Sequence, residues 1–233
     1  MIHLTDQERA QYVRAMFDRI APRYDLMNRL MTDGQDMRWR RWLLKTATLP
    51  VRGRLLDLGS GTGDVPLAAL RAHPGLCTVG ADFSEGMLRA GRARSGGSGV
   101  RWVSADAMQL PFSASTFDAV TSAFLMRNVV DLERAFGEQQ RVLRPGGKVA
   151  CLDTTPMGFS LLRPVLQFHL RRVIPLLGRL MVGQVEAYTY LSASSESFLP
   201  AEVLAEFMRA AGFRDVTFRR MMFGTVALHW GAK

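Results

Sequence analysis

Leu56 to Asp64 reads LDLGSGTGD, an apolar run that passes directly into a glycine-rich loop. Gly59, Gly61 and Gly63 carry no Cβ, so the backbone of this loop can approach a ligand closely and adopt positive φ angles. Asp82 stands 19 residues after Gly63, at the end of the next strand-like run, where an acidic residue can bind both hydroxyls of a ribose. Strand, loop, helix, strand and acid in this order predict a nucleotide-binding α/β fold.

Short apolar runs alternate with helical stretches around this loop. The strands expected in the core are Arg54–Leu58, Thr78–Ala81, Val100–Ser104, Phe117–Phe124 and Lys148–Leu152. Helices are expected from the loop to about Ala72, from the capping residue Ser84 onward, and over Leu132–Leu143, where the sequence Arg-Pro-Gly-Gly stops the last one. This alternation predicts an α/β protein with a parallel, doubly wound sheet.

The two ends of the chain depart from the alternation. Residues 1–50 are expected to form a helical cap, with Val13, Met16, Phe17 and Ile20 on its apolar face. Residues 155–198, which include the apolar and basic stretch Ser160–Met181, are expected to form a helical insertion after the fifth strand.

The last part of the chain, residues 200–233, predicts one helix and two strands. The helix is expected over Glu202–Ala211, followed by strand-like runs at Asp215–Met222 and Thr225–Trp230. These runs are joined through Phe223 and Gly224 and predict an antiparallel hairpin that closes the sheet. We therefore expect one domain over residues 1–233, with a mostly parallel, seven-stranded sheet and a cofactor-binding core at 54–153.

Composition excludes several classes of protein. Apolar residues make up 48% and charged residues 22% of the 233 residues, which excludes wholesale disorder. Cys77 and Cys151 have no metal-ligand spacing, so we expect no metal site, no disulfide framework and a reducing cytoplasm. A charged N-terminus and the lack of an 18-residue apolar run argue against a signal peptide and a transmembrane helix.

The net charge of +9 is concentrated in two segments. Residues 1–54 hold eleven Lys and Arg against six Asp and Glu, and residues 155–182 hold four Arg and no acid. One interpretation is an electrostatic footprint for an anionic membrane surface, an acidic partner or nucleic acid. The other is solvated surface, since Arg outnumbers Lys 27 to 3 in a pattern typical of coding bias. On the first interpretation, the protein associates peripherally with the inner face of the cell membrane.

The residues around the glycine loop indicate which nucleotide it binds. Asp64 follows the loop at once and would repel a pyrophosphate, whereas acids such as Asp57 and Asp64 suit the sulfonium and amino group of S-adenosylmethionine. After the third strand, Asp106 can accept a hydrogen bond from the adenine amino group. The alternative is that Asp57 and Asp106 only cap loops.

This organisation resembles the class I S-adenosylmethionine-dependent methyltransferases, and within them the demethylmenaquinone and ubiquinone C-methyltransferase family. The resemblance rests on FDRIAPRYDLMN (17–28), LDLGSGTGD (56–64), DFSEGML (82–88), ADAMQLPF (105–112), RNV (127–129), LRPGG (143–147), AYTYL (187–191) and VALHWG (226–231). The chain departs from the family pattern beside the expected substrate mouth, with Ala123 where the family often has Ser and Leu125 where it has Gly.

The resemblance implies a cofactor site, an acceptor and roles for named residues. The expected cofactor-binding residues are Asp57, Gly59, Gly61, Thr62, Gly63, Asp82, Phe83, Asp106, Ala107 and Ala123. The expected reaction is transfer of a methyl group to a ring carbon of a reduced demethylated quinone, with S-adenosylhomocysteine as the product. Arg127 is the leading candidate for stabilising a phenolate or orienting a water, because a guanidinium is a poor base.

Three residues of the N-terminal segment and two histidines are further candidates for the site. Tyr24, Asp25 and Asn28 are expected to close over the acceptor, although capping of a helix explains the last two equally well. His169 is weighed as a minor catalytic candidate, and His229 is expected to be structural. Methionines that either line a lipophilic pocket or fill the core are Met16, Met27, Met31, Met37 and Met181.

Alternative functions are methylation of another lipophilic or phenolic small molecule and a regulator that has lost catalysis. A nucleic-acid methyltransferase is disfavoured, because SAFLMRN stands where a DPPY- or NPPY-type run would follow the fourth strand. The expected partners are therefore a lipophilic quinol or phenolic substrate, the membrane surface and, in a homodimer, a second copy of the chain.

Overall fold

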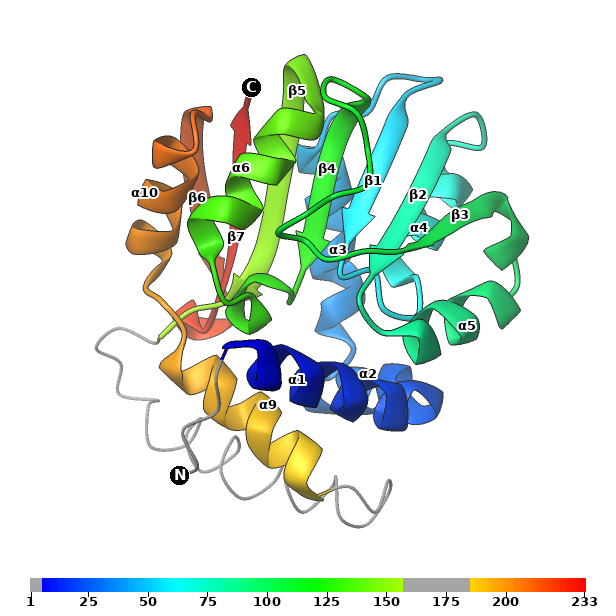
Figure 1. Ribbon diagram of the computed structural model, residues 1–233, viewed down its shortest axis with the longest axis vertical. Coiled ribbons are helices and arrows are strands. Elements are labelled where there is room, and N and C mark those ends of the chain that lie inside the picture. The colour runs from blue at the N-terminus through cyan, green and yellow to red at the C-terminus, as the bar shows by residue number, and fades with distance from the viewer. Residues whose placement is uncertain (1–5, 157–184) are drawn as a thin grey trace.

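A computed structural model describes residues 6–156 and 185–233, and these form a seven-stranded sheet flanked by helices (Figure 1). The strand order is β3-β2-β1-β4-β5-β7-β6. The strands are β1 (Arg54–Leu58), β2 (Cys77–Asp82), β3 (Val100–Ser104), β4 (Phe117–Ala123), β5 (Leu143–Thr154), β6 (Arg214–Met221) and β7 (Val226–Ala232). Only β7 runs against its neighbours among these strands, so the predicted class and the closing hairpin are confirmed.

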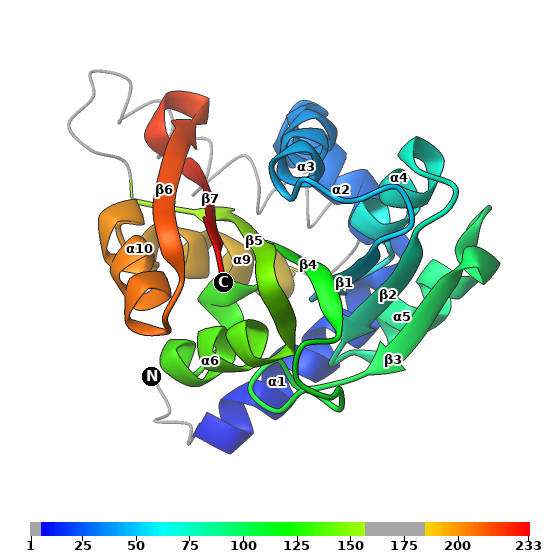
Figure 2. The same ribbon diagram turned by 90° about the horizontal axis from the view of Figure 1, so that it is seen from above.

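Helices cover both faces of the sheet (Figure 2). Two of them, α3 (Gln35–Thr46) and α4 (Asp64–Ala72), bury Trp39, Leu43 and Val65 on one face. On the other face, α6 (Leu132–Val142) and α10 (Ala201–Ala210) bury Phe136, Leu204 and Met208. Because both faces are covered, β1 reads as a nearly continuous apolar run rather than as an alternating one.

The helix after β2, α5 (Glu85–Ala93), begins at the predicted cap. The Ser84 hydroxyl accepts a hydrogen bond from the Met87 N–H at 3.1 Å. Along the same helix, Gly91 allows the ring of Trp102 on β3 to approach, since a Cβ at Gly91 would lie 2.5 Å from that ring. The helix therefore packs tightly against the outer strands of the nucleotide-binding half.

The expected helical cap is present at the N-terminus. It comprises α1 (Asp6–Ile20), a 3₁₀ turn η1 (Ala21–Arg23) and α2 (Tyr24–Met31), and α9 (Val185–Ser197) lies beside it at the carboxyl ends of the parallel strands (Figure 1). A shared apolar cluster joins these helices to α5 and contains Met16, Ile20, Met27, Met87, Ala187 and Leu191. This cluster fixes a roof over the edge of the sheet at which ligands bind in doubly wound folds.

The predicted strand boundaries lie within two residues of the observed ones except at the start of β5. β5 starts at Leu143, directly after α6, because Arg144 to Gly147 belong to the strand and produce an irregular register against β4. β7 continues to Ala232, two residues past the expected end. Ser160–Met181 lies outside the described residues, and within those that are described no helix combines the length and apolarity needed to cross a membrane.

Candidate active site

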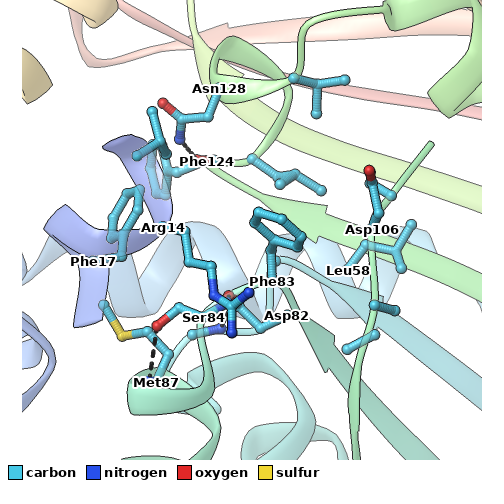
Figure 3. A pocket seen from close by; sticks show the side chains of 18 of the residues that line it. Arg14, Phe17, Leu58, Asp82, Phe83, Ser84, Met87, Asp106, Phe124 and Asn128 are labelled. Atoms are coloured by element: carbon cyan, nitrogen blue, oxygen red, sulfur yellow. Dashed lines mark hydrogen bonds between the residues drawn. The ribbon is translucent and has the colours of Figure 1, made fainter. Parts of the chain in front are cut away.

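A pocket opens between the roof and the carboxyl ends of β1, β2 and β4. Figure 3 shows Asp82 and Phe83 on one wall, Asp106 opposite, and Arg14 reaching over from α1. Its lining comprises Val13, Arg14, Phe17, Tyr24, Leu58, Gly59, Gly61, Ala81, Asp82, Phe83, Ser84, Met87, Ala105, Asp106, Ala107, Met108, Ala123, Phe124, Leu125, Asn128, Val129 and Val130. Mostly apolar walls with a few convergent polar groups are typical of a small-molecule site.

The glycine loop forms the floor of the pocket. Gly59 has a φ of +61°, and a Cβ there would lie 2.9 Å from Leu125 Cδ1, so a larger residue would be both strained and crowded. Gly63 faces away from the pocket, and a Cβ there would lie 2.4 Å from the ring of Trp102. Gly59 and Gly61 are therefore the two loop glycines at the pocket, while Gly63 allows helix-to-strand packing.

Asp82 lies at the pocket where the sequence places it. Its Oδ2 accepts the Gly61 N–H at 2.7 Å and its Oδ1 accepts the Ser84 N–H at 2.8 Å. Burial raises its pKa, while these backbone hydrogen bonds oppose the rise. A carboxylate oriented by two backbone amides retains lone pairs for further donors, such as the hydroxyls of a ribose.

One aromatic ring, that of Phe83, and one further carboxylate, that of Asp106, line the pocket near Asp82. The Phe83 ring is 38% exposed, and the Arg14 guanidinium carbon lies 5.2 Å from its centre. Asp106 Oδ1 accepts the Met108 N–H at 2.8 Å, and Ala107 lies between them. Asp106 thus caps its own turn and also lines the pocket, so its hydrogen bond to an adenine stays a prediction.

Asp57 and Asp64, the acids that surround the glycine loop in sequence, do not line the pocket. Asp57 is buried inside β1, where it accepts the Thr121 hydroxyl at 2.6 Å, and burial raises its pKa to about 8. Asp64 is bound by Arg94 at 2.8 Å and Arg29 at 3.2 Å. Asp57 and Asp64 thus contact internal partners rather than the pocket in which the sulfonium was expected to face them.

The charge of Asp64 is held by arginines from both the cap and the core. Burial alone would raise its pKa, but the charge of Arg40 and the hydrogen bonds from Arg29 and Arg94 hold the pKa below its usual range. Arg40 also contacts Asp36 at 2.6 Å within α3. This network joins α2 of the cap and α3 of the core to the start of α4 and, through Arg94, to the end of α5.

Of the three residues expected to close over the acceptor, one lines the pocket and two do not. Tyr24 lines the pocket, whereas Asp25 accepts the Thr62 hydroxyl and pairs with Arg94 at 3.1 Å. Thr62 therefore ties the cap to the glycine loop and does not line the pocket. Asn28 lies off the pocket, and its Nδ2 is buried with no hydrogen-bond partner among the described residues.

Arg127 lies behind the pocket wall. It belongs to the 3₁₀ turn η3 (Met126–Asn128), and its Nη1 donates to Asp153 Oδ1 at 2.8 Å, with both side chains buried. Its neighbours Leu125 and Asn128 line the pocket, but Arg127 does not. Contact with an acceptor therefore requires this guanidinium to leave Asp153 or the wall to shift.

Several pocket residues were not singled out from the sequence. Val13 and Phe17 belong to the apolar face predicted for the N-terminal helix, and Asn128 belongs to the Arg-Asn-Val motif, so each had a sequence signal. Phe124 had none, yet it lines the pocket with a φ of +61°, and Arg40 and Arg127 lie 5.6 and 5.3 Å from its ring. A strained aromatic residue at the end of a strand is typical of a functional site.

The remaining candidates are placed as follows. His229 is buried, and its Nε2 lies 2.9 Å from the Ala201 carbonyl oxygen, in keeping with the expected structural role. Met16 and Met27 fill the apolar cluster of the roof, and Met31 packs against it. Met37 is half-buried off the pocket, while His169 and Met181 lie outside the described residues.

A family model described as the ubiE/COQ5 methyltransferase family matches residues 4–233. The chain belongs to this family. Among members of the ubiE/COQ5 methyltransferase family, the ubiquinone/menaquinone biosynthesis C-methyltransferase UbiE of Desulfotalea psychrophila is 48% identical over 221 residues, covering 95% of this chain and 90% of that protein. The demethylmenaquinone methyltransferase of Roseiflexus sp. (strain RS-1) is 43% identical over 226 residues, covering 97% and 95%.

Solved structures agree with the fold of the ubiE/COQ5 family. A SAM-dependent methyltransferase from Thermotoga maritima superposes with a TM-score of 0.64 at 22% identity, covering 94% of this chain and 99% of that one. The cyclase SpnF superposes with a TM-score of 0.70 at 18% identity, covering 96% of each chain. At these identities the likeness shows the class I methyltransferase fold alone, because one fold hosts different reactions.

Proposed function

We propose that this protein transfers the methyl group of S-adenosylmethionine to a ring carbon of a reduced demethylated quinone of the menaquinone or ubiquinone type. Membership of the ubiE/COQ5 family and the names of the relatives support this reaction. The pocket supports it independently, because its polar groups suit an adenosine and its apolar walls suit an aromatic ring.

The cofactor half of the site is assigned from the described contacts. Asp82 holds the ribose hydroxyls, since backbone amides orient its carboxylate at the end of β2. Phe83 offers its exposed ring to the adenine face, and Asp106 offers an acceptor to the exocyclic amine. Gly59 and Gly61 let the cofactor approach the backbone, and the small side chains of Ala107 and Ala123 leave room around it.

The acceptor half is assigned to the roof and to the loop after β4. Phe17 and Tyr24, whose ring centres lie 5.8 Å apart, cover the pocket from α1 and α2. Leu125, Val129 and Val130 supply apolar contacts from below. These residues orient an aromatic ring and exclude water, which is most of what an in-line methyl transfer asks of a protein.

The cofactor, when bound, supplies an activated methyl group on a sulfonium. The ring carbon becomes nucleophilic when a neighbouring hydroxyl loses its proton, so the site needs a cation or a donor near that oxygen. Arg127 is assigned this role, acting as a guanidinium that stabilises the phenolate or orients a water after exchanging its contact with Asp153. Asn128, at the pocket on the same turn, is placed to donate or accept beside it.

The observation that carries the proposal is the position of Asp82, Phe83 and Asp106 around one pocket beneath an aromatic roof. Mass spectrometry of products formed from S-adenosylmethionine and a reduced demethylated menaquinone analogue tests it. We expect a product heavier by one methylene group, with the methyl on a ring carbon. An O-methylated product, or turnover only with unrelated phenols, would favour another small-molecule methyltransferase.

Peripheral membrane association is the second part of the proposal. α3 carries the exposed basic residues Arg38, Arg41 and Lys45. The guanidinium carbons of Arg38 and Arg219 lie 4.7 and 5.1 Å from the centre of the Trp42 ring on the same helix as Arg38. Arginine beside tryptophan suits the interface of an anionic bilayer, where a polyprenylated quinol resides. The basic segment 155–182 lies largely outside the described residues.

Co-sedimentation with vesicles containing anionic lipid tests this association. Binding at low salt that is lost as the salt concentration rises is expected, since each basic group contributes about 1 kcal/mol within a Debye length. Replacing Arg38, Arg41 and Lys45 together with Gln should weaken binding, whereas Lys148→Gln, one exchange elsewhere on the surface, is the control. Absence of binding at low salt would leave the basic residues as solvated surface.

A further inference from the structure

Asp18 connects the N-terminal helix α1 directly to the start of α5. Its Oδ1 accepts the Ser84 hydroxyl at 2.6 Å and the Gly86 N–H at 2.8 Å. The first turn of any α-helix has N–H groups without intrahelical partners and a partial positive charge, and a carboxylate satisfies both. Asp18 therefore acts as a second cap on α5, supplied by a different helix.

Ser84 links Asp18 to the cofactor pocket by two hydrogen bonds. The same residue that donates its hydroxyl to Asp18 donates its backbone N–H to Asp82 Oδ1 at 2.8 Å. The other oxygen of Asp82 accepts the Gly61 N–H. A continuous set of hydrogen bonds thus runs from α1, through the start of α5, to the carboxylate assigned to the ribose and on to the glycine loop.

Close packing reinforces this set of bonds. A Cβ at Gly86 would lie 2.8 Å from Asp18 Oδ1 and 3.0 Å from Asp18 Cα, so α1 approaches α5 at a distance that only glycine permits. One turn earlier on α1, Arg14 lies over the Phe83 ring (Figure 3). Arg14 also pairs with Glu85 at 3.6 Å. The helix therefore contacts the two residues that follow Asp82, Phe83 through Arg14 and Ser84 through Asp18.

We propose that Asp18 is a positioning residue of the cofactor site, which fixes the Asp82 carboxylate through Ser84 and makes cofactor affinity depend on docking of the N-terminal helix. This rests on the proposed function, in which Asp82 holds the ribose. The negative charge of Asp18 also raises the pKa of Asp82 beyond the effect of burial, so the two carboxylates influence each other electrostatically as well as through Ser84.

A double-mutant cycle with S-adenosylhomocysteine tests the proposal by isothermal titration calorimetry. Asp18→Ala should weaken binding about tenfold, as expected for loss of hydrogen bonds to a charged group. In an Asp82→Asn background the same change should have little further effect, because Asp18 acts through Asp82. Asp18→Asn keeps an acceptor oxygen and should retain most of the affinity. Arg19→Ala, at the neighbouring exposed position, is the matched control and should bind as the wild type does.

Gly86→Ala supplies a second test that does not depend on the folding of the Asp18 variants. Alanine favours a helix over glycine, so a purely local effect would stabilise α5. Weaker binding of S-adenosylhomocysteine by Gly86→Ala, with an unchanged or higher melting temperature, supports the proposal. Unchanged affinity in both Asp18→Ala and Gly86→Ala overturns it, as does an equal loss for Asp18→Ala in the two backgrounds. Absence of binding by the wild-type chain would instead overturn the assignment of the cofactor site itself.

Discussion

Charged side chains have different partners in the two halves of the sheet edge at the pocket, one formed by β2 and β3 and the other by β4 and β5. At the ends of β2 and β3, Asp82 and Asp106 are held by backbone N–H groups and face the pocket. At the ends of β4 and β5, Arg127 and Asp153 face each other and are buried behind the wall. The first half presents oriented hydrogen-bond acceptors to the pocket, whereas the charges of the second half contact each other. On the proposed function, Arg127 has to exchange this internal contact before its charge can act on the acceptor.

Burial explains why this difference matters. Two backbone amides fix a carboxylate without neutralising it, so Asp82 keeps its capacity to accept hydrogen bonds from a ligand. A buried ion pair satisfies itself, and removing one partner leaves an uncompensated charge in a medium of low dielectric constant. Substitutions in the first half should therefore change binding, and substitutions in the second half should first change stability.

The largest effect is expected from Asp153→Ala. The substitution leaves the Arg127 guanidinium buried without its partner, and we expect the free energy of unfolding to fall by about 3–5 kcal/mol. Urea denaturation followed by circular dichroism measures it. Asp131→Ala, which removes the exposed cap of α6, is the control and should cost about 1 kcal/mol. Similar losses in the two variants would mean that the pair is not the stabilising contact inferred here.

Replacing both partners separates stability from catalysis. Arg127→Met together with Asp153→Leu leaves no unpaired charge, so the fold should be retained. If Arg127 stabilises the developing phenolate, turnover should fall about 10²–10³-fold while affinity for S-adenosylhomocysteine stays near that of the wild type. Steady-state kinetics and calorimetry give the two quantities. Retained turnover would confine Arg127 to a structural role.

Asp82→Ala should act on binding in the first half of the edge. Loss of the charged acceptor is expected to weaken S-adenosylmethionine binding by about 1.5–3 kcal/mol. Asp57→Asn is a matched control. Asp57 lies near the carboxyl end of β1, at the same edge of the sheet, but its side chain contacts Thr121 and does not line the pocket. Calorimetry that finds equal losses in the two variants would contradict the distinction between them.

Asp57 is expected to make the free energy of unfolding depend on pH. Its pKa of about 8 in the folded state exceeds the usual value, so folded protein holds a proton that the unfolded chain has lost. This contribution to stability is complete below the usual pKa and declines as pH rises toward 8, by at most about 1.4 kcal/mol per pH unit. In urea denaturation at pH 5 to 8, the free energy of unfolding of Asp57→Asn should rise relative to that of the wild type as pH rises. Parallel curves would contradict a protonated Asp57.

Sequence order alone predicts the strands and the first half of the site well. Asp82, Asp106 and the loop glycines follow strands directly, and parallel strands bring such residues to one edge. Asp57, Asp64 and Thr62 stand beside the same loop in sequence, yet their partners come from β4, α2, α3 and α5. Those partners are set by three-dimensional packing, which neither periodicity nor spacing reveals.

Arg127 and Phe124 show the same limit from the other side. The Arg-Asn-Val motif predicts a functional turn after β4, with Arg127 as its leading residue. In the structure Asn128 of this turn lines the pocket, whereas the Arg127 side chain pairs with Asp153 on β5. Phe124 has no motif, and it reaches the pocket because a positive φ at the end of β4 turns the chain there. Neither the strained backbone nor the choice between neighbouring side chains is encoded in a local pattern.

The apolar cluster of the roof has a consequence for how the protein is made. Met16 and Met27 emerge early in synthesis, but they share this cluster with Ala187 and Leu191, which follow more than 150 residues later. Contacts of such high sequence separation form slowly, because the chain between them loses entropy when it closes. α9 is therefore the last helix to join the roof, long after α1 and α5 have been made and can contact each other through Asp18 and Gly86.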